Sequence, residues 1–476
     1  MYQATGGAAG WREVFAKGRG GLFGLICLGV WLNAADTLVV ATLLPSVGSA
    51  LGGYEAFGWA TAGFLLGSVL SGAASGLAAE RIGLARATSV ASLVYASGCV
   101  LSALAGDMTG FITGRILQGL GGGALAGLCQ VAVGVLFPER SLARVYSGVS
   151  SVWGAATLAG PLLGGLFADA GVWRGVFWLF AAQALVVAFL ALRMFPGRPA
   201  RPSSRPIGWL QLGLIGVGVC LIAVADQAPR GAAAAGLVGL GVAVLGACLR
   251  LDRFRAARLL PRGAHQPGSV LGAAYATLFL LTASSMGFVV YGPALLQRLA
   301  DASALTAGYV IASQSIAWTV CGLCVAGLGG KWPARLVSLG ALGVGLGVLL
   351  CGLAFSQGSL PAATAAGLVL GTGFGMCWAF ISQAVIVATP RAESERAAAG
   401  ATTVRLTGAA TGAALASVLA GQLGFAENLS PATAQRVGLW VFWAALPLAG
   451  LGVISALRLA SALAAERPAD QSWSRP

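Results

Sequence analysis

Residues 21–45 read GLFGLICLGVWLNAADTLVVATLLP, in which Asp36 is the single charged side chain. An α-helix of about 20 apolar residues crosses the hydrocarbon core of a bilayer, and this stretch is long enough to do so. The whole chain has the same character: 57% of its 476 residues are apolar, 9% are charged, and its mean hydropathy is +0.84. Because soluble domains carry about 25% charged residues, this composition excludes an ordinary soluble enzyme, a disordered chain and a collagen-like repeat. It predicts a polytopic membrane protein.

Thirteen further segments pass the same length test, and charged or turn-forming residues separate them. Together with residues 21–45 they predict an all-α membrane protein with 14 transmembrane helices. The further segments are 57–79, 87–105, 109–136, 146–167, 175–195, 207–227, 233–250, 269–298, 304–329, 336–356, 361–389, 398–424 and 436–460. The turn between the seventh and eighth spans is the least well defined, because Gly231 and a run of alanines blur it.

The placement of Lys and Arg predicts the orientation of the chain. The net charge of +14 comes from 29 Lys and Arg against 15 Asp and Glu. With the N-terminus inside and the spans alternating, 23 of the 29 basic residues fall in cytoplasmic segments and 4 in outer segments. This asymmetry follows the positive-inside rule, predicts two cytoplasmic termini, and accounts for the charge without a nucleic-acid-binding surface. Because the run after the basic first 20 residues is long enough to span, no cleavable signal peptide is expected.

An internal repeat divides the chain. The Gly-x-Gly of Gln118–Gly121 recurs in Leu370–Gly373 at a shift of 252 residues, and the same shift relates Pro138 to Pro390. Two homologous halves of six helices each leave room for two inserted helices between them. The expected division is a cytoplasmic segment at 1–20, an N-terminal six-helix bundle at 21–195, a linker with two extra helices at 196–262, a C-terminal six-helix bundle at 263–460 and a cytoplasmic tail at 461–476.

Four short motifs occur in the first five predicted spans and the turns between them. Residues 36–45 read DTLVVATLLP and residues 76–86 read GLAAERIGLAR. Residues 115–121 read RILQGLG and residues 159–165 read AGPLLGG. In this order the motifs resemble those of the major facilitator superfamily, specifically its 14-helix drug:proton antiporter branch, with Glu80 where the family has Asp. The resemblance covers nearly the whole chain and implies two six-helix bundles that rock around a central site.

Two features depart from that branch. The Trp-Arg motif after the fifth span is reduced to WRGVF at residues 173–177, without the Asn and Pro that usually follow. The entry to the second span, GGYEAFGW at residues 52–59, resembles riboflavin-transporter-like members of the superfamily. Import of a planar vitamin such as riboflavin is therefore the alternative to drug export.

Asp36 is the only acidic residue placed in the interior of a predicted span, because Asp226 lies one position from the end of the span 207–227. A charge at mid-helix costs about 2.5–3.5 kcal/mol on insertion scales, so such residues usually face an interior or a water path. A carboxyl that is hydrated in one state and desolvated in another changes its proton affinity, as proton coupling requires. It can equally attract a cationic substrate or make a structural hydrogen bond. The resemblance implies that Arg115 is its counter-charge; an interfacial Arg that snorkels outward is the alternative.

Two groups of residues are candidates for conformational gating. A charged turn after the second span can latch against neighbouring helix ends, or it can be plain positive-inside charge. Glycines in the fifth span let another helix approach closely, and a proline there permits a bend, for gating or for simple packing. The gating candidates are Glu80, Arg81, Arg86, Gly160, Pro161, Gly164 and Gly165.

Aromatic and amide side chains occur on the helices expected to line the cavity. Such side chains suit a bulky, planar, partly apolar ligand. Each Trp alone fits packing or interfacial anchoring better, so the prediction rests on the set. An Arg in the thirteenth span either contacts substrate or snorkels inward. The substrate-binding candidates are Asn33, Gln118, Trp153, Tyr291, Gln314, Trp318, Trp378, Gln383 and Arg405.

No cofactor, metal site or catalytic residue is expected. The glycines at 119–123 lie inside a predicted helix with no preceding strand, which argues against a dinucleotide loop. The nine cysteines all lie in apolar stretches, where Cys acts as a small hydrophobe. The single histidine, His265, lies in a predicted loop.

The resemblance and the residues together predict a proton-coupled secondary transporter in the inner membrane of a bacterium. Multidrug efflux of hydrophobic or cationic compounds by antiport is the leading hypothesis. The expected partners are the substrate, protons and membrane lipids, without nucleic acid, and the expected state is a monomer. The alternative of another class is a non-transporting scaffold or an intramembrane enzyme, which predicts no solute flux in proteoliposomes.

Overall fold

In the computed structural model, the regular secondary structure of the described residues is entirely helical. These are 15, 19–53, 56–137, 139–195, 208–225, 228–229, 231–255, 257–266, 268–325, 328, 331–390, 393–425 and 430–465. No strand occurs in these ranges. The all-α fold class predicted from composition is therefore confirmed.

Each predicted span coincides with one helix or with two consecutive helices. The first part of the chain forms α2 (Arg19–Leu51), α3 (Phe57–Ile82), α4 (Leu84–Leu104), α5 (Met108–Leu136), α6 (Glu139–Asp169) and α7 (Arg174–Met194). The middle forms α8 (Trp209–Val224) and α9 (Ala232–Phe254). The last part forms α10 (Val270–Val290), α11 (Gly292–Leu299), α12 (Ala304–Val325), α13 (Trp332–Ser356), α14 (Leu360–Val387), α15 (Ser394–Gln422), α16 (Pro431–Trp443) and α17 (Leu446–Ala465).

Two of the predicted spans are each interrupted by a break. The ninth divides at Tyr291 into α10 and α11, and the last divides between α16 and α17. Proline is the second residue of α11 and of α17, at Pro293 and Pro447. Because proline lacks an N–H and fits only the first turn of a helix, a new helix starts at each of these points.

The described helices include twelve that are long and apolar enough to cross a membrane. A thirteenth is obtained if α3 is taken as one span with a 45° bend between Gly72 and Ala74. The remaining predicted span corresponds to α8, an apolar helix of 16 residues that is shorter than a usual crossing. The count of 14 crossings stays a prediction.

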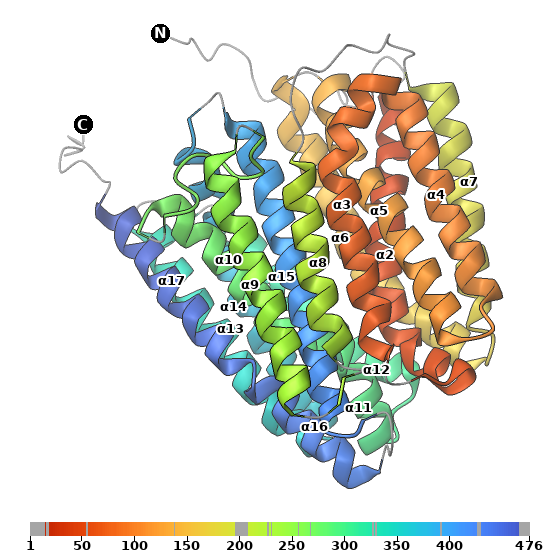
Figure 1. The fold of residues 1–476 in the computed structure, drawn as a ribbon. Helices are drawn as coiled ribbons and strands as arrows, with labels where there is room; N and C mark the ends of the chain where they lie inside the picture. Colours follow the sequence, from red (N-terminus) through yellow and green to blue (C-terminus); the bar gives the residue numbers. More distant parts are fainter. Residues whose placement is uncertain are drawn as a thin grey trace.

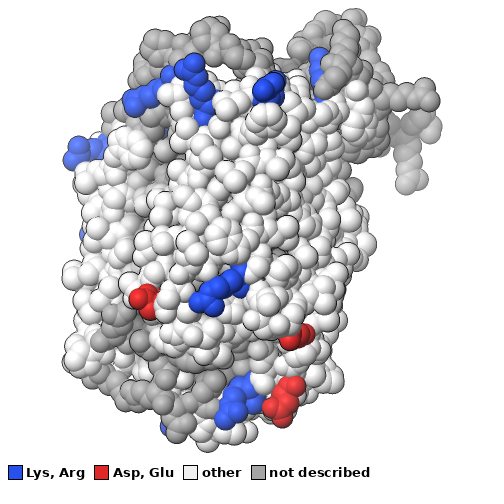
Figure 2. All heavy atoms as spheres, turned by 90° about the vertical axis from the view of Figure 1, so that its right-hand side faces the viewer, with Lys and Arg blue, Asp and Glu red and all other residues white. Residues whose placement is uncertain are grey.

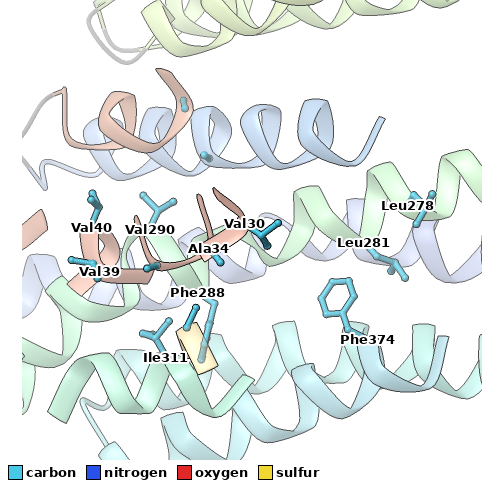
Figure 3. Packing of buried hydrophobic residues seen from close by; sticks show 14 of the residues in the cluster. Val30, Ala34, Val39, Val40, Leu278, Leu281, Phe288, Val290, Ile311 and Phe374 are labelled. Atoms are coloured by element: carbon cyan, nitrogen blue, oxygen red, sulfur yellow. The ribbon is translucent and has the colours of Figure 1, made fainter. Parts of the chain in front are cut away.

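The helices gather into two groups, with α8 and α9 lying together in front of them in Figure 1. We call α2–α7 the N-terminal bundle and α10–α17 the C-terminal bundle. The bundles meet where α3 packs against α15 and where α6 packs against α12, while α8 packs along both α3 and α15. One cluster of buried apolar side chains includes residues of both bundles, and Figure 3 shows its members from α2, α10, α12 and α14.

The glycines of the internal repeat occupy equivalent places in the two bundles. In α5, Gly119 and Gly123 lie against the backbone of α3, and Gly121 lies against the backbone of α4. Their counterparts in α14, shifted by 252 residues, lie in the same alternation against α12 and α13. A Cβ atom at any of these six positions would overlap the facing helix. The two bundles are therefore packed in the same way around one central helix each.

The surface has the charge distribution of a membrane protein. Figure 2 shows a broad band without charge, with Lys and Arg near its upper rim and both signs of charge in the lower half of the view. The exposed large side chains include many Leu and Val, such as Leu323 and Val387. We call the Arg-rich end, where α3 turns into α4 at Arg81 and Arg86, the basic end, and the other the opposite end.

Candidate functional site

A buried ion pair joins α2 to α5 inside the N-terminal bundle. Nη1 of Arg115 donates hydrogen bonds to both carboxylate oxygens of Asp36, over 3.0 Å to Oδ1 and 2.8 Å to Oδ2. The two residues are 2% and 0% exposed. Because a buried charge without a partner is very unfavourable, each side chain stabilises the other here. The pairing that the family resemblance implied is present.

Gln118, one turn after Arg115, connects this pair to α4. Its Oε1 accepts hydrogen bonds from Arg115 Nη1 over 3.1 Å and from the Ser102 hydroxyl over 3.2 Å. Its Nε2 faces Asp36 Oδ1 at 3.4 Å and Cys99 Sγ at 3.1 Å. Gln118 was predicted as a substrate contact, and it lies fully buried within this network. The amide holds both charged groups in a fixed orientation.

The arginine also has two contacts to α3. Its Nε donates to the backbone oxygen of Ala60 over 3.3 Å, and its guanidinium lies 4.4 Å from the centre of the Phe64 ring. A cation over an aromatic face is attracted by the ring quadrupole, most strongly when water is excluded. Arg115 is therefore held by α2, α3 and α5 at once.

Small residues bring these helices close enough for the network to form. A Cβ at Gly98 would lie against Gln118, and one at Gly114 would overlap Ser102. Both glycines thus let α4 and α5 approach to backbone contact. The glycine-rich character of these spans, visible in the sequence, is what places short polar side chains within hydrogen-bonding distance.

Three members of this site on α4 escaped the sequence analysis: Tyr95, Cys99 and Ser102. All three are 0% exposed. The Tyr95 side chain is buried beside Asp36 and Cys99. Positions 95, 99 and 102 lie on one face of an α-helix. This helical spacing of polar residues is the sequence feature that could have identified them.

Protonation of Asp36 would change the contacts in this network. Protonation of Asp36 removes the negative charge that holds Arg115, and it turns one carboxylate oxygen from an acceptor into a donor. The guanidinium would then lose its ionic partner and keep neutral ones: the other carboxyl oxygen of Asp36, Gln118, the Ala60 carbonyl and the Phe64 ring. A change at one carboxyl would thus loosen the contact between α2 and α5.

A second group of predicted residues lines a cavity in the C-terminal bundle. The cavity has a volume of about 330 Å³ and lies between α14 and α15, with Leu278 of α10 at its wall. Trp378 and Arg405 both line it, and the guanidinium carbon lies 6.0 Å from the centre of the tryptophan ring. Trp318 of α12 stacks on Phe374 with ring centres 4.9 Å apart and meets Trp378 at 5.0 Å.

The remaining substrate-binding candidates are dispersed. Asn33 is half-buried, and its Oδ1 lies near Gly122 of α5. Gln314 is buried in α12, and Tyr291 is buried at the α10–α11 break, edge-on to Phe425. Trp153 and Gln383 are exposed on α6 and α14. The structure therefore does not gather these five side chains into the cavity that contains Trp378 and Arg405.

The glycines predicted for gating lie where α6 meets two other helices. Gly160 and Gly164 face α2, at Leu38 and Thr42. A Cβ at Gly165 would lie 2.6 Å from Cα of Leu305 in α12, and Pro161 lies against Gly308 of α12. Near these contacts, the backbone N–H of Ala304 donates to Asp169 Oδ1 over 3.3 Å. The two bundles thus touch closely at the opposite end of the molecule.

The charged turn predicted as a latch lies at the basic end. Glu80, Arg81 and Arg86 are exposed and make no ion pair with other described residues. Gly83 has a φ of 84°, which permits the tight turn between α3 and α4. The predicted latch, a contact between this charged turn and neighbouring helix ends, stays a prediction.

A third polar cluster orders the segment after α9. The carboxylate of Asp252 accepts hydrogen bonds from the backbone N–H groups of Leu259 and Leu260 and lies 3.0 Å from His265 Nε2. No group of three or more His, Cys, Asp or Glu side chains in the described ranges could hold a metal ion.

Two paired bundles of apolar helices are the architecture of many secondary transporters. A family model for the Major Facilitator Superfamily matches residues 26–211, which include Asp36, Arg115 and Gln118. A probable multidrug-efflux transporter of Mycobacterium tuberculosis is 29% identical over 474 residues, which cover 95% of this chain and 97% of that relative. Over residues 26–211 the chain is similar to the Major Facilitator Superfamily, and over nearly its whole length it is similar to that relative.

Two solved structures share its fold. A crystal structure of the peptide transporter POT in complex with sulfate has a TM-score of 0.67 at 17% identity, covering 93% of this chain and 95% of that one. The D-xylose–proton symporter has a TM-score of 0.61 at 19% identity, covering 90% and 96%. At these identities the two solved structures show a shared fold, that of a multi-pass helical membrane protein.

Proposed function

We propose that this transporter exports small organic molecules across the plasma membrane of a bacterium by proton antiport. The whole-length similarity to a probable multidrug-efflux transporter supports the export of drug-like compounds. The asymmetric distribution of Lys and Arg supports a cytoplasmic location for the basic end. In this orientation the close contacts of α6 with α12 lie at the outer side.

The observation that carries the proton coupling is the bond between Asp36 and Arg115. The pair is buried, neutral overall and joined to α4 through Gln118. In an outward-facing state, a proton that reaches Asp36 would release Arg115 and favour the conformational change. In an inward-facing state, loss of that proton to the cytoplasm would restore the ion pair. A proton then moves inward for each cycle that moves substrate outward.

The α6–α12 contact supports alternating access as the mechanism. Gly165 of α6 lies against Leu305 of α12, and Pro161 of α6 lies against Gly308 of α12, so the two bundles approach closely at these points. A contact built from such small residues can open and reform as the bundles rock.

The test is proton-driven flux in proteoliposomes that contain the purified protein. With a pH gradient imposed, the unaltered protein is expected to transport dyes or drugs against their gradient. Asp36→Asn keeps the size of the side chain but cannot exchange a proton, so gradient-driven flux should fall to the leak of protein-free liposomes. Asp107→Asn is the matched control, because Asp107 is an exposed acid at the start of α5.

Two outcomes would contradict this proposal. Undiminished gradient-driven flux in Asp36→Asn at equal protein content would remove the proton role from Asp36. Uptake of riboflavin, rather than export of drugs, under the physiological gradient would replace efflux with vitamin import. Both gradient directions and both kinds of solute therefore belong in the same experiment.

A further inference from the structure

The cavity between α14 and α15 contains a cation without a counter-ion. Arg405 lines this cavity and makes no hydrogen bond or ion pair with any described residue. It lies eleven positions after the start of α15, inside an apolar span. No Asp or Glu is among the described residues that line the cavity, whose other polar side chains are Ser382 and Thr402. An unpaired guanidinium at such a position is costly unless a ligand supplies a negative group.

An aromatic wall stands beside this cation. Trp378 lines the cavity and belongs to a cluster with Trp318 and Phe374. The rest of the lining is apolar, with Leu278, Val385 and Ile386. Stacked rings fix the orientation of Trp378 and present a flat apolar surface. A planar aromatic ligand can lie on this surface while its charged group reaches Arg405.

The charges inside the two bundles favour an anion over a cation at this cavity. The carboxylate of Asp36 is committed to Arg115, with hydrogen bonds from the guanidinium to both oxygens. It can therefore attract a cation only when that pair is broken. Arg405 has no such neutralising partner, and it would repel a cation that entered the cavity. The cavity therefore favours an anionic substrate, whereas Asp36 alone, seen in the sequence, suggests a cationic one.

We propose that the cavity lined by Trp378 and Arg405 is a substrate subsite for planar aromatic compounds that carry a carboxylate. The guanidinium would bind the carboxylate through two parallel N–H···O hydrogen bonds, the geometry that suits this pair best. The tryptophan would stack on the ring system. The inference rests on the proposed export function, and it names the class of substrate that the C-terminal bundle selects.

The test compares two ligands that differ in one charge. The probes are a rhodamine dye with a free carboxylate and the methyl ester of the same dye. Binding to the purified protein is measured by fluorescence polarisation, without any pH gradient. The protein is expected to bind the carboxylate dye about tenfold or more tightly than the ester, as a charge-assisted hydrogen bond would give. Arg405→Gln should abolish this preference, and Arg405→Lys should retain part of it.

Arg335→Gln is the matched control. Arg335 also lies 6.0 Å from a tryptophan ring, that of Trp332, but on an exposed surface of α13 away from this cavity. Its replacement should leave the preference for the carboxylate unchanged. Equal binding of the two dyes, or a preference that survives Arg405→Gln, would overturn the subsite.

The binding measurement separates this inference from the transport mechanism. Asp36→Asn should lose proton-driven flux and still prefer the carboxylate dye. If it keeps full proton-driven flux while Arg405→Gln loses the preference, the coupling proposal fails and the subsite stands. If flux is lost as expected but no preference is found, the subsite fails and the coupling stands.

Discussion

The Asp36 carboxylate and the Arg115 guanidinium are shielded from water on all sides by α2, α3, α4 and α5. A buried pair of this kind contributes little net stability compared with an apolar pair, because both charges lose their hydration. Removal of one partner is far more costly, since it leaves the other charge buried and unpaired. A functional need for charged groups at this position therefore explains the pair better than a contribution to the stability of the folded protein.

This reasoning predicts a non-additive effect of substitution. Arg115→Gln leaves the Asp36 carboxylate without its ionic partner and should destabilise the protein by about 3–5 kcal/mol. The double variant Asp36→Asn with Arg115→Gln should be more stable than Arg115→Gln alone. Thermal unfolding of the detergent-purified variants measures both effects. Additive losses in the double variant would show that the two side chains do not depend on each other.

The glycines of α5 act at the scale of the element, because they set how closely whole helices approach. Gly121 faces the backbone of Tyr95, whereas Gly134 of the same helix has no atom within 4 Å of the position that a Cβ would take. Replacement of Gly by Ala in a helix normally adds about 0.5–1 kcal/mol of stability. Overpacking at a closed position costs about 1–3 kcal/mol.

The two positions should therefore respond in opposite directions. Gly121→Ala should lower the melting temperature, because its Cβ pushes α5 away from α4 and from the network around Gln118. Gly134→Ala should leave the melting temperature unchanged or raise it. Parallel thermal unfolding of both variants makes the comparison, and an equal response would contradict the close-packing role of Gly121.

At the scale of the whole molecule, transport requires the two bundles to move relative to each other. The contact of Gly165 in α6 with Leu305 in α12 joins them at the opposite end. A Cβ at Gly165 would lie 2.7 Å from the Leu305 Cβ, and a disulfide needs about 3.5–4.5 Å. A small separation of the helices is thus enough for a cross-link.

A disulfide between Gly165→Cys and Leu305→Cys should stop flux in proteoliposomes by holding this end closed. A reducing agent should restore the flux, because the bundles can again separate. Either single cysteine variant is the control, with the exposed Cys324 replaced by Ala in all of them. Continued flux in the cross-linked protein would mean that the two helices need not part during transport.

The local features were predictable from the sequence because they depend on spacing and composition. Apolar runs of sufficient length locate helices, since a bilayer or apolar core selects them by hydropathy. Asp36 is identifiable because a single acid in such an apolar run is costly and therefore stands out. Glycines that recur at a constant shift of 252 residues reveal the repeat. Each of them is required because a Cβ atom at its position would overlap a neighbouring helix. The pairing with Arg115 was available only through the resemblance, because 79 residues separate the two side chains.

Only the tertiary structure decided which side chains share a site. It enclosed Gln118 with Cys99 and Ser102, separated Trp153 and Gln383 from the cavity, and left Arg405 beside Trp378 without an acidic partner. Helix rotation and tilt determine these contacts, and both depend on packing between elements distant in the chain. Hydropathy, which is nearly uniform around these helices, specifies that they form but not which face each turns toward the others.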